Sequence, residues 1–536
     1  MKTNSILFCL IAFYANINMT ANAQVNEQDS LALVDLYNST HGVIWYDHTN
    51  WLTSKPVSTW YGITVTNTRV TVIYMGYNNL NGSIPSSFGN LVNLNYLWLS
   101  NNHLTGSIPS SIGKLANLKE LDISDNQLTG SIPTSIGNLV KLEFLDLYFN
   151  QLSGSIPSSI GNLKSIIHFA VSGNQLTGSI PSSIGRLVTI RYLLLSGNQL
   201  TGSIPSSIRK LVKLEYLYLA SNQLTGSIPS YIGKFRNLLE LDLGSNQLTG
   251  SIPSSIGNLV NLQFLYLYDN QLSGSISASI GKLLNLNNLY LNNNRLSGSI
   301  PSSIGNLVNL YFLYLNNNRL SGSIPSSLNH LSNLNWTYGL NLSHNHSTFD
   351  GLELFAQTFP YAIYAPQKLI PVHQNSNTLS VSAGGTLSNN TYKWFRYRKT
   401  GITLIATITG DSVFHPTQNG LYRVKVTNSI ATQLKLHSDT IYYKAADNSL
   451  ITSSENALEQ HGRTNLCLVY PNPAKDIIYV QPNGNTSFSL LNQSGKILLT
   501  TNINGKGSIN ISGMAAGLYY LKNNSTKVVQ KVVIAR

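Results

Sequence analysis

Cysteine is almost absent from this chain of 536 residues, which holds only Cys9 and Cys467. Cys9 falls within an N-terminal segment that we expect to be removed, so Cys467 has no partner in the mature chain. The sequence therefore excludes an intrachain disulfide. The fold must be stabilised by its apolar core, and a chain of this length has ample material for one.

Charged residues are also scarce, at 10% of the sequence, and the formal net charge is +13. Residues 346–536 carry seventeen Lys and Arg against eight Asp and Glu, whereas residues 82–345 carry fourteen against nine. Nucleic-acid binding calls for basic residues concentrated on one groove or helix beside stacking aromatics. The pattern instead indicates a solvated basic surface with some attraction for anionic glycans, and no nucleic-acid site.

A long apolar run and a catalytic motif are missing too. After residue 23 no segment approaches the ~20 continuous apolar residues of a membrane-spanning helix. The sequence has no H-E-x-x-H, no G-x-S-x-G and no phosphate-cradling glycine loop. His344 and His346 with Asp350 come nearest to a metal site, but a surface H-x-H pair is more often without a metal. The sequence thus predicts no enzyme, no cofactor and no metal site.

What the sequence has in abundance is one repeated segment of 24 residues, of the form GSIPSSIGNLVNL. A fixed period of this length indicates a solenoid, in which each unit stacks only on its neighbours and the stack presents one long curved face. Function is therefore expected on a surface. The first glycine of the segment recurs at Gly82, Gly106, Gly130, Gly154, Gly178, Gly202, Gly226, Gly250, Gly274, Gly298 and Gly322.

One repeat, read from Leu94, is LNYLWLSNNHLTGSIPSSIGKLAN. Leu97 and Leu99 alternate with Tyr96 and Trp98, so we expect a short strand that buries the leucines and exposes the aromatics. Stacked strands would form a parallel sheet on the concave wall, and short 3-10 or irregular segments would form the convex wall. The positions expected to point inward are Leu94, Leu97, Leu99, Asn102, Leu104, Ile108, Ile112 and Leu115.

The pattern L-x-x-L-x-L-x-x-N-x-L-x-G-x-I-P is matched about eleven times over residues 70–345 and resembles the plant-type leucine-rich repeats. The resemblance implies a right-handed solenoid. Two units depart from the pattern, with Arg209 in place of glycine and Ser277 in place of proline, where we expect local softness and no new chemistry. The asparagine leaving each strand is expected to bond backbone groups of adjacent coils. This ladder comprises Asn102, Asn126, Asn150, Asn174, Asn198, Asn222, Asn246, Asn270, Asn294 and Asn318.

The outward positions of the predicted concave strands hold aromatic and acidic residues. Exposed Tyr and Trp supply contact area at low entropic cost and are enriched where partners bind. The alternative is that the rings only pack on one another across strands. We interpret the face as a binding surface, because smaller β-branched residues would serve the stability of the sheet alone. The candidate site residues are Tyr96, Trp98, Asp122, Phe144, Asp146, Tyr192, Tyr216, Tyr218, Asp242, Phe264, Tyr266, Tyr290, Phe312 and Tyr314.

Three kinds of ligand remain open at this stage. A protein partner is favoured by the acids and by the length of the wall, on the order of 50 Å for strands ~4.8 Å apart. A glycan is the alternative, with aromatics stacking on sugar rings and acids accepting hydrogen bonds from hydroxyl groups. Ice or surface binding is the minor alternative, because the GSIPSS segments of the outer wall give an ordered array of hydroxyl groups.

The solenoid is flanked by sequence that can cover its exposed apolar ends. Residues 1–23 combine a lysine, an apolar stretch and an Ala-Asn-Ala cleavage site, as in a secretory signal peptide. Residues 24–69 resemble the N-terminal cap of plant-type repeats, although Ser58 and Val65 stand near the positions of its usual cysteine pair. Residues 346–367 are predicted to form a C-terminal cap.

Residues 368–444 lose the period and alternate in short runs, which indicates a small β-sandwich. They resemble an immunoglobulin-like domain, with Trp394 at the core tryptophan, Tyr422 at the tyrosine corner and Val424 in place of the second cysteine. We expect this domain to act as a spacer. Residues 445–465 are polar and aperiodic, as in a linker.

Residues 466–536 hold a second set of ordered motifs, VYPNPA, FSLLNQSGKILL, ISGMAAGLYYLK and QKVVIAR. They resemble the C-terminal sorting domain of the type IX secretion system of Bacteroidetes, which implies contact with that machinery, export, and release or attachment at the outer-membrane surface. In that setting three D-[S/T]-aliphatic triplets resemble O-glycosylation acceptors, at Ser30, Ser412 and Thr440. The sequence thus predicts a secreted or cell-surface adhesion or recognition protein.

Overall fold

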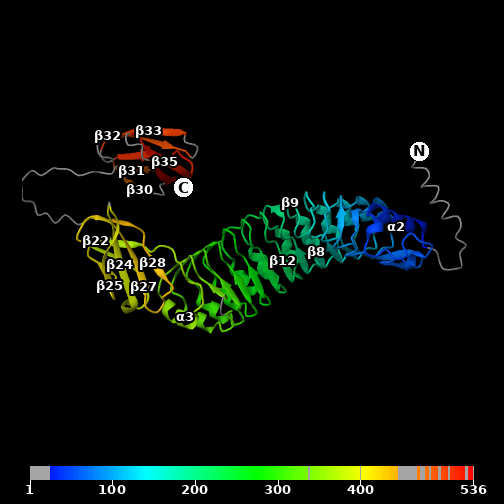
Figure 1. Ribbon diagram of the computed structural model, residues 1–536, viewed down its shortest axis with the longest axis horizontal. Coiled ribbons are helices and arrows are strands. Elements are labelled where there is room, and N and C mark those ends of the chain that lie inside the picture. The colour runs from blue at the N-terminus through cyan, green and yellow to red at the C-terminus, as the bar shows by residue number, and fades with distance from the viewer. Residues whose placement is uncertain are drawn as a thin grey trace, which may run out of the picture. The chain divides into compact units, whose positions relative to one another are not determined.

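The structure is a computed structural model of the chain. The described residues fall into two compact units, Met1–Ala446 and Asp447–Arg536 (Figure 1). The predicted signal peptide, the predicted linker and Cys467 lie outside the described residues. The described ranges are 25–335, 338–398, 400–444, 468–470, 477–481, 485–492, 496–504, 507–524 and 529–534.

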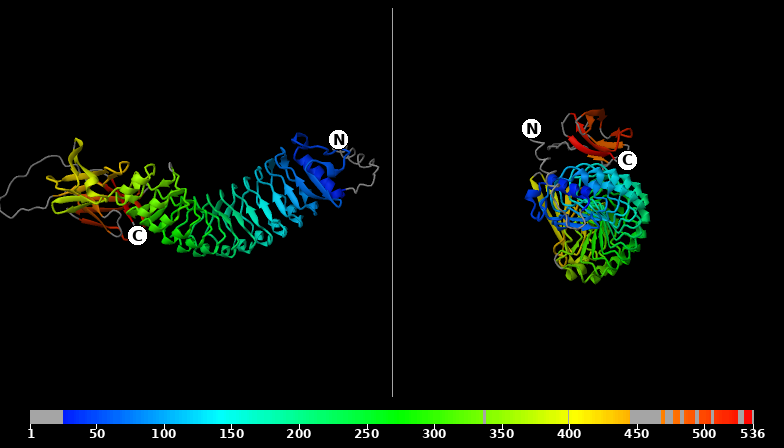
Figure 2. Two further views of the ribbon diagram at one scale, coloured as in Figure 1. Left: turned by 90° about the horizontal axis from the view of Figure 1, so that it is seen from below. Right: turned by 90° about the vertical axis from the view of Figure 1, so that its right-hand side faces the viewer.

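A thirteen-stranded sheet lines the concave side of the first unit (Figure 2). β1 (Ile63–Thr66) opens it, antiparallel to β2 (Arg69–Tyr74), and the later strands pair in parallel. Equivalent residues of successive repeats pair with each other, as Tyr192 does with Tyr216, so each repeat position forms a column of side chains. The later strands are β4 (Tyr96–Trp98), β6 (Glu120–Asp122), β7 (Phe144–Asp146), β8 (His168–Ala170), β10 (Tyr192–Leu194), β12 (Tyr216–Tyr218), β13 (Glu240–Asp242), β14 (Phe264–Tyr266), β16 (Asn288–Tyr290), β18 (Phe312–Tyr314) and β20 (Leu340–Asn341).

Short 3-10 helices form the convex side. Proline precedes most of them because its ring fixes φ at the value needed there, −67° at Pro181. Ser277 reaches −64° and its side chain accepts the N–H of Ser279, so the helix forms there as in the other coils. The helices are η3 (Ser86–Asn90), η4 (Ser110–Lys114), η5 (Thr134–Asn138), η6 (Ser158–Asn162), η7 (Ser182–Arg186), η8 (Ser206–Lys210), η9 (Ser230–Lys234), η10 (Ser254–Asn258), η11 (Ala278–Lys282), η12 (Ser302–Asn306) and η13 (Ser326–His330).

Short parallel strands ahead of the 3-10 helices complete the coils. They pair in three groups, β3 with β5, β9 with β11, and β15 through β21. Their bounds are β3 (Asn81–Ser83), β5 (His103–Thr105), β9 (Thr177–Ser179), β11 (Gln199–Thr201), β15 (Ser273–Gly274), β17 (Arg295–Gly298), β19 (Arg319–Gly322) and β21 (His346–Ser347).

The interior of the solenoid is apolar except for the asparagine ladder. All eight inward positions predicted for the repeat that begins at Leu94 are buried. Asn126 shows the ladder geometry: its Nδ2 donates to the carbonyl of Leu99 in the preceding coil at 3.0 Å, and its Oδ1 accepts the N–H of Leu104 at 2.9 Å. Each such amide therefore joins two coils, because it hydrogen-bonds a buried backbone carbonyl and a buried N–H at the end of the strand.

The N-terminal cap consists of α2 (Glu27–Ser39), η1 (Gly42–Ile44) and η2 (Val57–Thr59). Its centre is a cluster of buried tryptophans, in which the Trp51 ring lies 4.9 Å from that of Trp45 and 4.9 Å from that of Trp60. These rings cover apolar surface that the first coil would otherwise expose to water.

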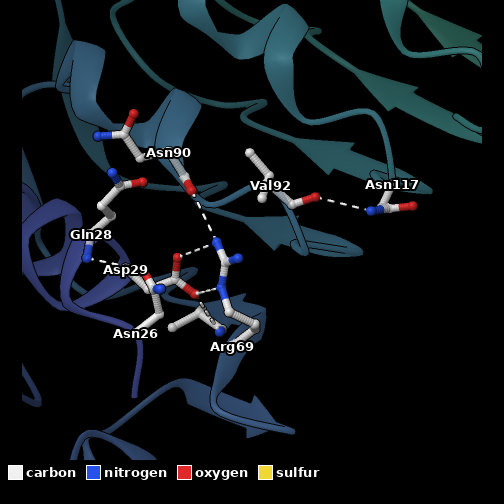
Figure 3. A network of polar contacts seen from close by, with 8 residues as sticks. Asn26, Gln28, Asp29, Arg69, Asn90, Val92 and Asn117 are labelled. Carbon is white, nitrogen blue, oxygen red and sulfur yellow. Dashed lines mark hydrogen bonds and ion pairs between the residues drawn. The ribbon is translucent and has the colours of Figure 1, made fainter. Parts of the chain in front are cut away.

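A buried ion pair fixes α2 to the first long strand (Figure 3). The carboxylate of Asp29 is fully buried, and its two oxygens accept the Arg69 guanidinium at 2.7 and 3.0 Å. The N–H of Val70 donates to the same carboxylate at 2.8 Å, and Arg69 also reaches the carbonyl of Asn90 at 3.3 Å. The pair is therefore satisfied on both sides, as a buried charge requires.

A β-sandwich follows the solenoid. Its core holds Trp394, fully buried and stacked on Phe414 at 5.1 Å, and Tyr422, whose hydroxyl donates to the carbonyl of Gln418 at 2.5 Å. These are the contacts expected of the core tryptophan and the tyrosine corner. One sheet has β22 (Val372–Asn375), β23 (Thr378–Val381) and β26 (Val413–Phe414); the other has β24 (Asn390–Arg398), β25 (Gly401–Thr409), β27 (Gly420–Asn428), β28 (Lys435–His437) and β29 (Ile441–Tyr443), and η14 (Leu387–Asn389) precedes β24.

Glu353 joins the sandwich to the C-terminal cap helix α3 (Leu352–Thr358). Its carboxylate accepts the N–H of Thr386 at 3.0 Å and the side-chain amides of Asn428 at 2.6 Å and Asn389 at 3.2 Å. Burial raises the pKa of Glu353, but these hydrogen bonds outweigh it and hold the pKa below its ordinary value. The ionised carboxylate therefore stabilises the contact between the sandwich and the solenoid.

Replacing Glu353 with alanine should lower the free energy of unfolding at pH 7 by about 1–3 kcal/mol, as for other charged hydrogen bonds. Because the pKa is lower in the folded state, the stabilisation is complete above the ordinary value of about 4.3 and is lost as pH falls through the folded value. Urea unfolding at pH 7 and pH 3 measures this. An equal deficit at both pH values, or the same deficit in the exposed-site control Glu27→Ala, would contradict the assignment.

The second unit consists of two antiparallel sheets around one small apolar core. Ile478, Phe488, Leu490 and Leu521 lie in that core. The sheet orders are β30-β31-β34 and β33-β32-β35-β36. The strands are β30 (Leu468–Tyr470), β31 (Ile477–Gln481), β32 (Asn485–Leu491), β33 (Ile497–Asn504), β34 (Gly507–Asn510), β35 (Gly517–Asn523) and β36 (Val529–Ile534).

Candidate binding surface

All fourteen candidate residues lie on the concave sheet, and each is half-buried. They occupy the first or last position of a three-residue strand, whose middle residue points into the core, as Leu265 does between Phe264 and Tyr266. In-register pairing places the first residues in one column and the last residues in another. The concave face therefore carries two parallel lines of side chains.

The largest group of rings, which we call the aromatic cluster, lies on β14, β16 and β18 and on the turn that follows β14. Tyr290 is at its centre, with its ring 4.7 Å from that of Tyr314 and 5.0 Å from that of Tyr266. Burial, together with the two neighbouring tyrosines, raises the pKa of Tyr290 to about 12, so its hydroxyl keeps its proton at neutral pH. The cluster comprises Phe264, Tyr266, Tyr268, Tyr290, Phe312 and Tyr314.

A second group of rings lies on β7 to β12. Tyr192 and Tyr216 stack face to face, with centroids 4.9 Å apart and planes 9° apart, and Tyr218 meets Tyr216 edge-on at 6.1 Å. His168 lies between Phe144 and Tyr192, at 6.2 and 5.4 Å. The aromatic line is thus continuous over these strands.

A third, smaller group lies at the N-terminal end of the sheet. The Trp98 ring is 5.5 Å from Tyr96 and 5.4 Å from Tyr74, which is 53% exposed. Between this group and the second lie two candidate acids that are bonded within the protein. Asp122 accepts the Ser124 hydroxyl at 2.6 Å, and Asp146 lies 2.8 Å from Nε2 of His168.

The remaining candidate acid, Asp242, lies beside the aromatic cluster, since it pairs with Tyr266 across β13 and β14. Burial raises its pKa to about 6, with a smaller contribution from the charge of Glu240, and the N–H of Gly244 partly offsets this at 3.0 Å. Burial also raises the pKa of Glu240, which the hydrogen bond from Tyr218 partly offsets. Two carboxylates that are costly to ionise thus share one strand, where a cationic or hydrogen-bond-donating partner would stabilise their charge.

The list of candidates chosen from the sequence left out five residues that stand on or beside the same columns. Glu240 and Tyr74 occupy the same repeat positions as chosen residues, so their place in the repeat could have identified them. His168 stands between two chosen rings. Tyr268 and Tyr148 lie two residues beyond a strand, at a shared repeat position that the alternation of the strand does not reach.

The rings both pack together and remain partly accessible. Offset and edge-on pairs at such separations contribute about 0.5–1.5 kcal/mol beyond burial, so the columns do stabilise the sheet. At the same time every candidate side chain keeps some exposed surface. The face therefore presents a preordered surface of ring edges, hydroxyl groups and carboxylates.

Outside the concave sheet, several hydroxyl groups of the short strands and of the 3-10 helices are turned toward the protein itself. Thr105, Thr177 and Thr249 donate to glycine carbonyls of the preceding coil at 3.2 to 3.3 Å. Ser135 and Ser159 do the same to other backbone carbonyls, at 2.6 Å. These groups are engaged within the solenoid, which weakens the interpretation of the outer wall as an array of free hydroxyls.

The three candidate glycosylation residues differ in accessibility. Ser30 is only 9% exposed, on the same buried side of α2 as Asp29, so the folded cap offers little access to its hydroxyl. Ser412 is half-buried, and Thr440 is exposed. Glycosylation of the folded protein stays a prediction for Ser412 and Thr440.

Among the described residues, no three His, Cys, Asp or Glu side chains gather closely enough to hold a metal ion. His344 instead contacts the Ser343 hydroxyl at 3.1 Å, and Asp350 accepts the Thr348 hydroxyl at 3.0 Å. No helix in the described ranges has the length and apolar character needed to cross a membrane.

Comparison with protein families assigns both units. A model described as a leucine-rich repeat region matches residues 68–175 and 170–293, and a leucine-rich repeat model matches residues 285–307 and 309–331. Residues 68–331 of the chain consist of leucine-rich repeats. A model described as a secretion system C-terminal sorting domain matches residues 468–535, as the resemblance to type IX sorting domains predicted. A comparison with curated protein sequences finds no significant match.

Several solved structures that are similar to this chain are receptor proteins or their complexes. A TDR receptor is 36% identical with a TM-score of 0.50, covering 51% of this chain and 47% of that chain. The Arabidopsis receptor kinase HAESA, in complex with the peptide hormone IDA and the co-receptor SERK1, is 33% identical with a TM-score of 0.53, covering 60% and 54%. PEPR1–AtPEP1 is 30% identical with a TM-score of 0.50, covering 64% and 55%. The chain spans about half the length of these structures.

Proposed function

We propose that this protein is an exported binding protein whose concave face binds a protein or peptide partner in adhesion or recognition. The observation that carries the proposal is the aromatic cluster, six half-buried rings on three adjoining strands and the turn after β14, beside Asp242 and Glu240. Tyrosine anchors of this kind, ordered before binding, contribute most of the energy at protein interfaces. The similarity to HAESA, solved with a peptide hormone, supports the same choice.

The sorting domain supports an extracellular place of action. We propose delivery through the type IX secretion machinery to the outside of the cell, with release or attachment at the outer-membrane surface. The concave face would then meet soluble or surface-bound partners. The β-sandwich, bonded to the solenoid through Glu353, would act as a spacer.

A protein partner is favoured over a glycan by the way in which the rings pack. Sugar rings stack on the flat faces of aromatics, whereas Tyr192 with Tyr216 and Tyr290 with Tyr314 already cover one face of each other. Ring edges and hydroxyl groups are what the columns present. Such edges suit the mixed apolar and hydrogen-bonding contacts of a polypeptide.

Selection of peptides from a random display library against the purified full-length protein tests this function. We expect enrichment of peptides with aromatic and basic residues. Because the pKa of Asp242 is about 6, its carboxylate is ionised at pH 7.5 and loses its charge as pH falls through 6, so the affinity for basic peptides should fall over that interval. Failure to enrich any peptide, together with specific capture on a glycan array, would favour the glycan alternative.

A further inference from the structure

Basic residues gather on one part of the solenoid, on the 3-10 helices and on the segments that lead from these helices to the concave strands. Residues 82–345 hold fourteen Lys and Arg, of which eight fall between residues 164 and 236, where Glu215 is the only acid. All eight side chains are exposed, and among them only Arg191 forms an ion pair with another described residue, Glu215. We call this group the basic flank: Lys164, Arg186, Arg191, Arg209, Lys210, Lys213, Lys234 and Arg236.

The repeat sets these charges in a regular line. Arg186, Lys210 and Lys234 are the last residues of η7, η8 and η9, and therefore occupy the same position in three successive coils. Lys213 and Arg236 follow in the segments that lead from helix to strand. Stacking at about 5 Å per coil thus presents cations at short, even intervals along one side of the solenoid.

Two surface hollows lie within the basic flank. One, of about 730 Å³, brings Lys164, Arg191 and Lys213 together with the polar side chains of Thr189 and Asn237. Glu143 and Glu215 also line it, so it is not purely cationic. The second hollow, of about 460 Å³, is lined by Tyr231, Lys234, Arg236, Ser255 and Asn258, among others. Both combine charge with neutral hydrogen-bonding groups.

The second hollow coincides with a break in the repeat. In nine other coils a glycine faces the next coil so closely that a Cβ on it would lie 2.3 to 2.7 Å from a serine carbonyl, as at Gly185 and Ser207, where the distance is 2.4 Å. Arg209 replaces that glycine, and Tyr231 replaces the serine that would oppose it. The Tyr231 hydroxyl donates to the carbonyl of Pro205 at 3.1 Å. Two matched departures from the repeat therefore occur at one coil interface, inside the basic flank.

We propose that the basic flank binds an extended anionic polysaccharide, independently of the concave face. The line of exposed cations fits a polymer with a negative charge on each sugar unit, and the Ser, Thr and Asn side chains of the hollows fit its hydroxyl groups. A single-stranded nucleic acid fits less well, because its binding sites stack bases on exposed aromatic rings. Tyr231 is the only aromatic residue that lines either hollow, and it is half-buried.

Affinity measurements on the full-length protein test the proposal, with dextran sulfate and polygalacturonate as probes and neutral dextran and a single-stranded DNA as comparisons. The variant K210Q/K234Q/R236Q should bind both acidic polysaccharides at least about tenfold more weakly than the wild type, and binding should weaken with added salt. The control K393Q/R398Q/K435Q removes the same number of positive charges from exposed sites on the sandwich. It should change affinity less than about twofold, and both variants should melt like the wild type, since exposed substitutions rarely alter stability by more than about 0.5 kcal/mol.

Three results would overturn the proposal. Equal losses in the two variants would show a general effect of net charge. Tighter binding to the single-stranded DNA than to either polysaccharide would assign the flank to nucleic acid. Equal affinities for the acidic polysaccharides and for neutral dextran would show that charge plays no part in binding.

Discussion

Replacing Asp29 with alanine should destabilise the N-terminal cap by about 2–3 kcal/mol, because the change removes charged hydrogen bonds and leaves a buried N–H unsatisfied. The cost stays in this range because the Arg69 side chain is 22% exposed and can be hydrated. The variant leaves the guanidinium of Arg69 and the N–H of Val70 without the carboxylate that both now contact (Figure 3). Trp45 and Trp51 lie in the same cap, so tryptophan fluorescence during urea unfolding reports the loss directly.

The matched control is Asp35→Ala, which removes an exposed carboxylate from the same helix. Its midpoint should stay close to that of the wild type. Each coil of a solenoid contacts only its neighbours, so the deficit of Asp29→Ala should be concentrated in the early coils. A uniform loss along the chain, or equal midpoints for the two variants, would contradict the role given to the pair.

Replacing Tyr218, Tyr266 and Tyr290 with serine should weaken binding of a selected peptide more than about 100-fold. Truncation of a central aromatic anchor costs about 2 kcal/mol or more, so two effective anchors among the three suffice for this loss. Tyr266 and Tyr290 are in contact at 5.0 Å and act as one patch, so their effects should not be additive. Titration of the labelled peptide measures the change.

The control for this variant is Tyr311→Ser, Tyr361→Ser and Tyr442→Ser, which removes three exposed tyrosines outside the concave columns. It should bind as the wild type does. The concave variant should keep a cooperative melt, although at a lower temperature, because ring contacts are lost. Loss of the folded state in the concave variant alone would show that the columns serve the sheet and not a partner.

The sequence predicted the solenoid and its core because both depend on a local period. Leu97 and Leu99 are buried, and the ladder position of Asn126 bonds across coils, since one repeat dictates the surroundings of every equivalent residue. The same logic placed the concave columns. The repeat period alone assigns each residue to the core or to the surface, without information on which side chains are in contact.

The repeat period does not predict specific contacts between side chains of different coils. Arg209 was expected to cause only local softness, because Tyr231, whose hydroxyl interacts electrostatically with it, lies one coil further along the chain. The triplet that begins at Asp29 looked like a modification signal, because three residues do not encode burial; the carboxylate instead binds Arg69, forty residues away. The raised pKa of Asp242 likewise depends on the surrounding rings and on Glu240.

Hydroxyl-radical footprinting of the full-length protein, free and bound to a selected peptide, tests the central claim most directly. Tyrosine side chains are oxidised according to their exposure, so the bound partner should protect Tyr266, Tyr290 and Tyr314. Oxidation of Tyr77, Tyr311 and Tyr361, which are exposed outside the concave columns, should stay unchanged. Protection of these outer tyrosines with unaltered oxidation of the concave ones would contradict a binding role for the concave face.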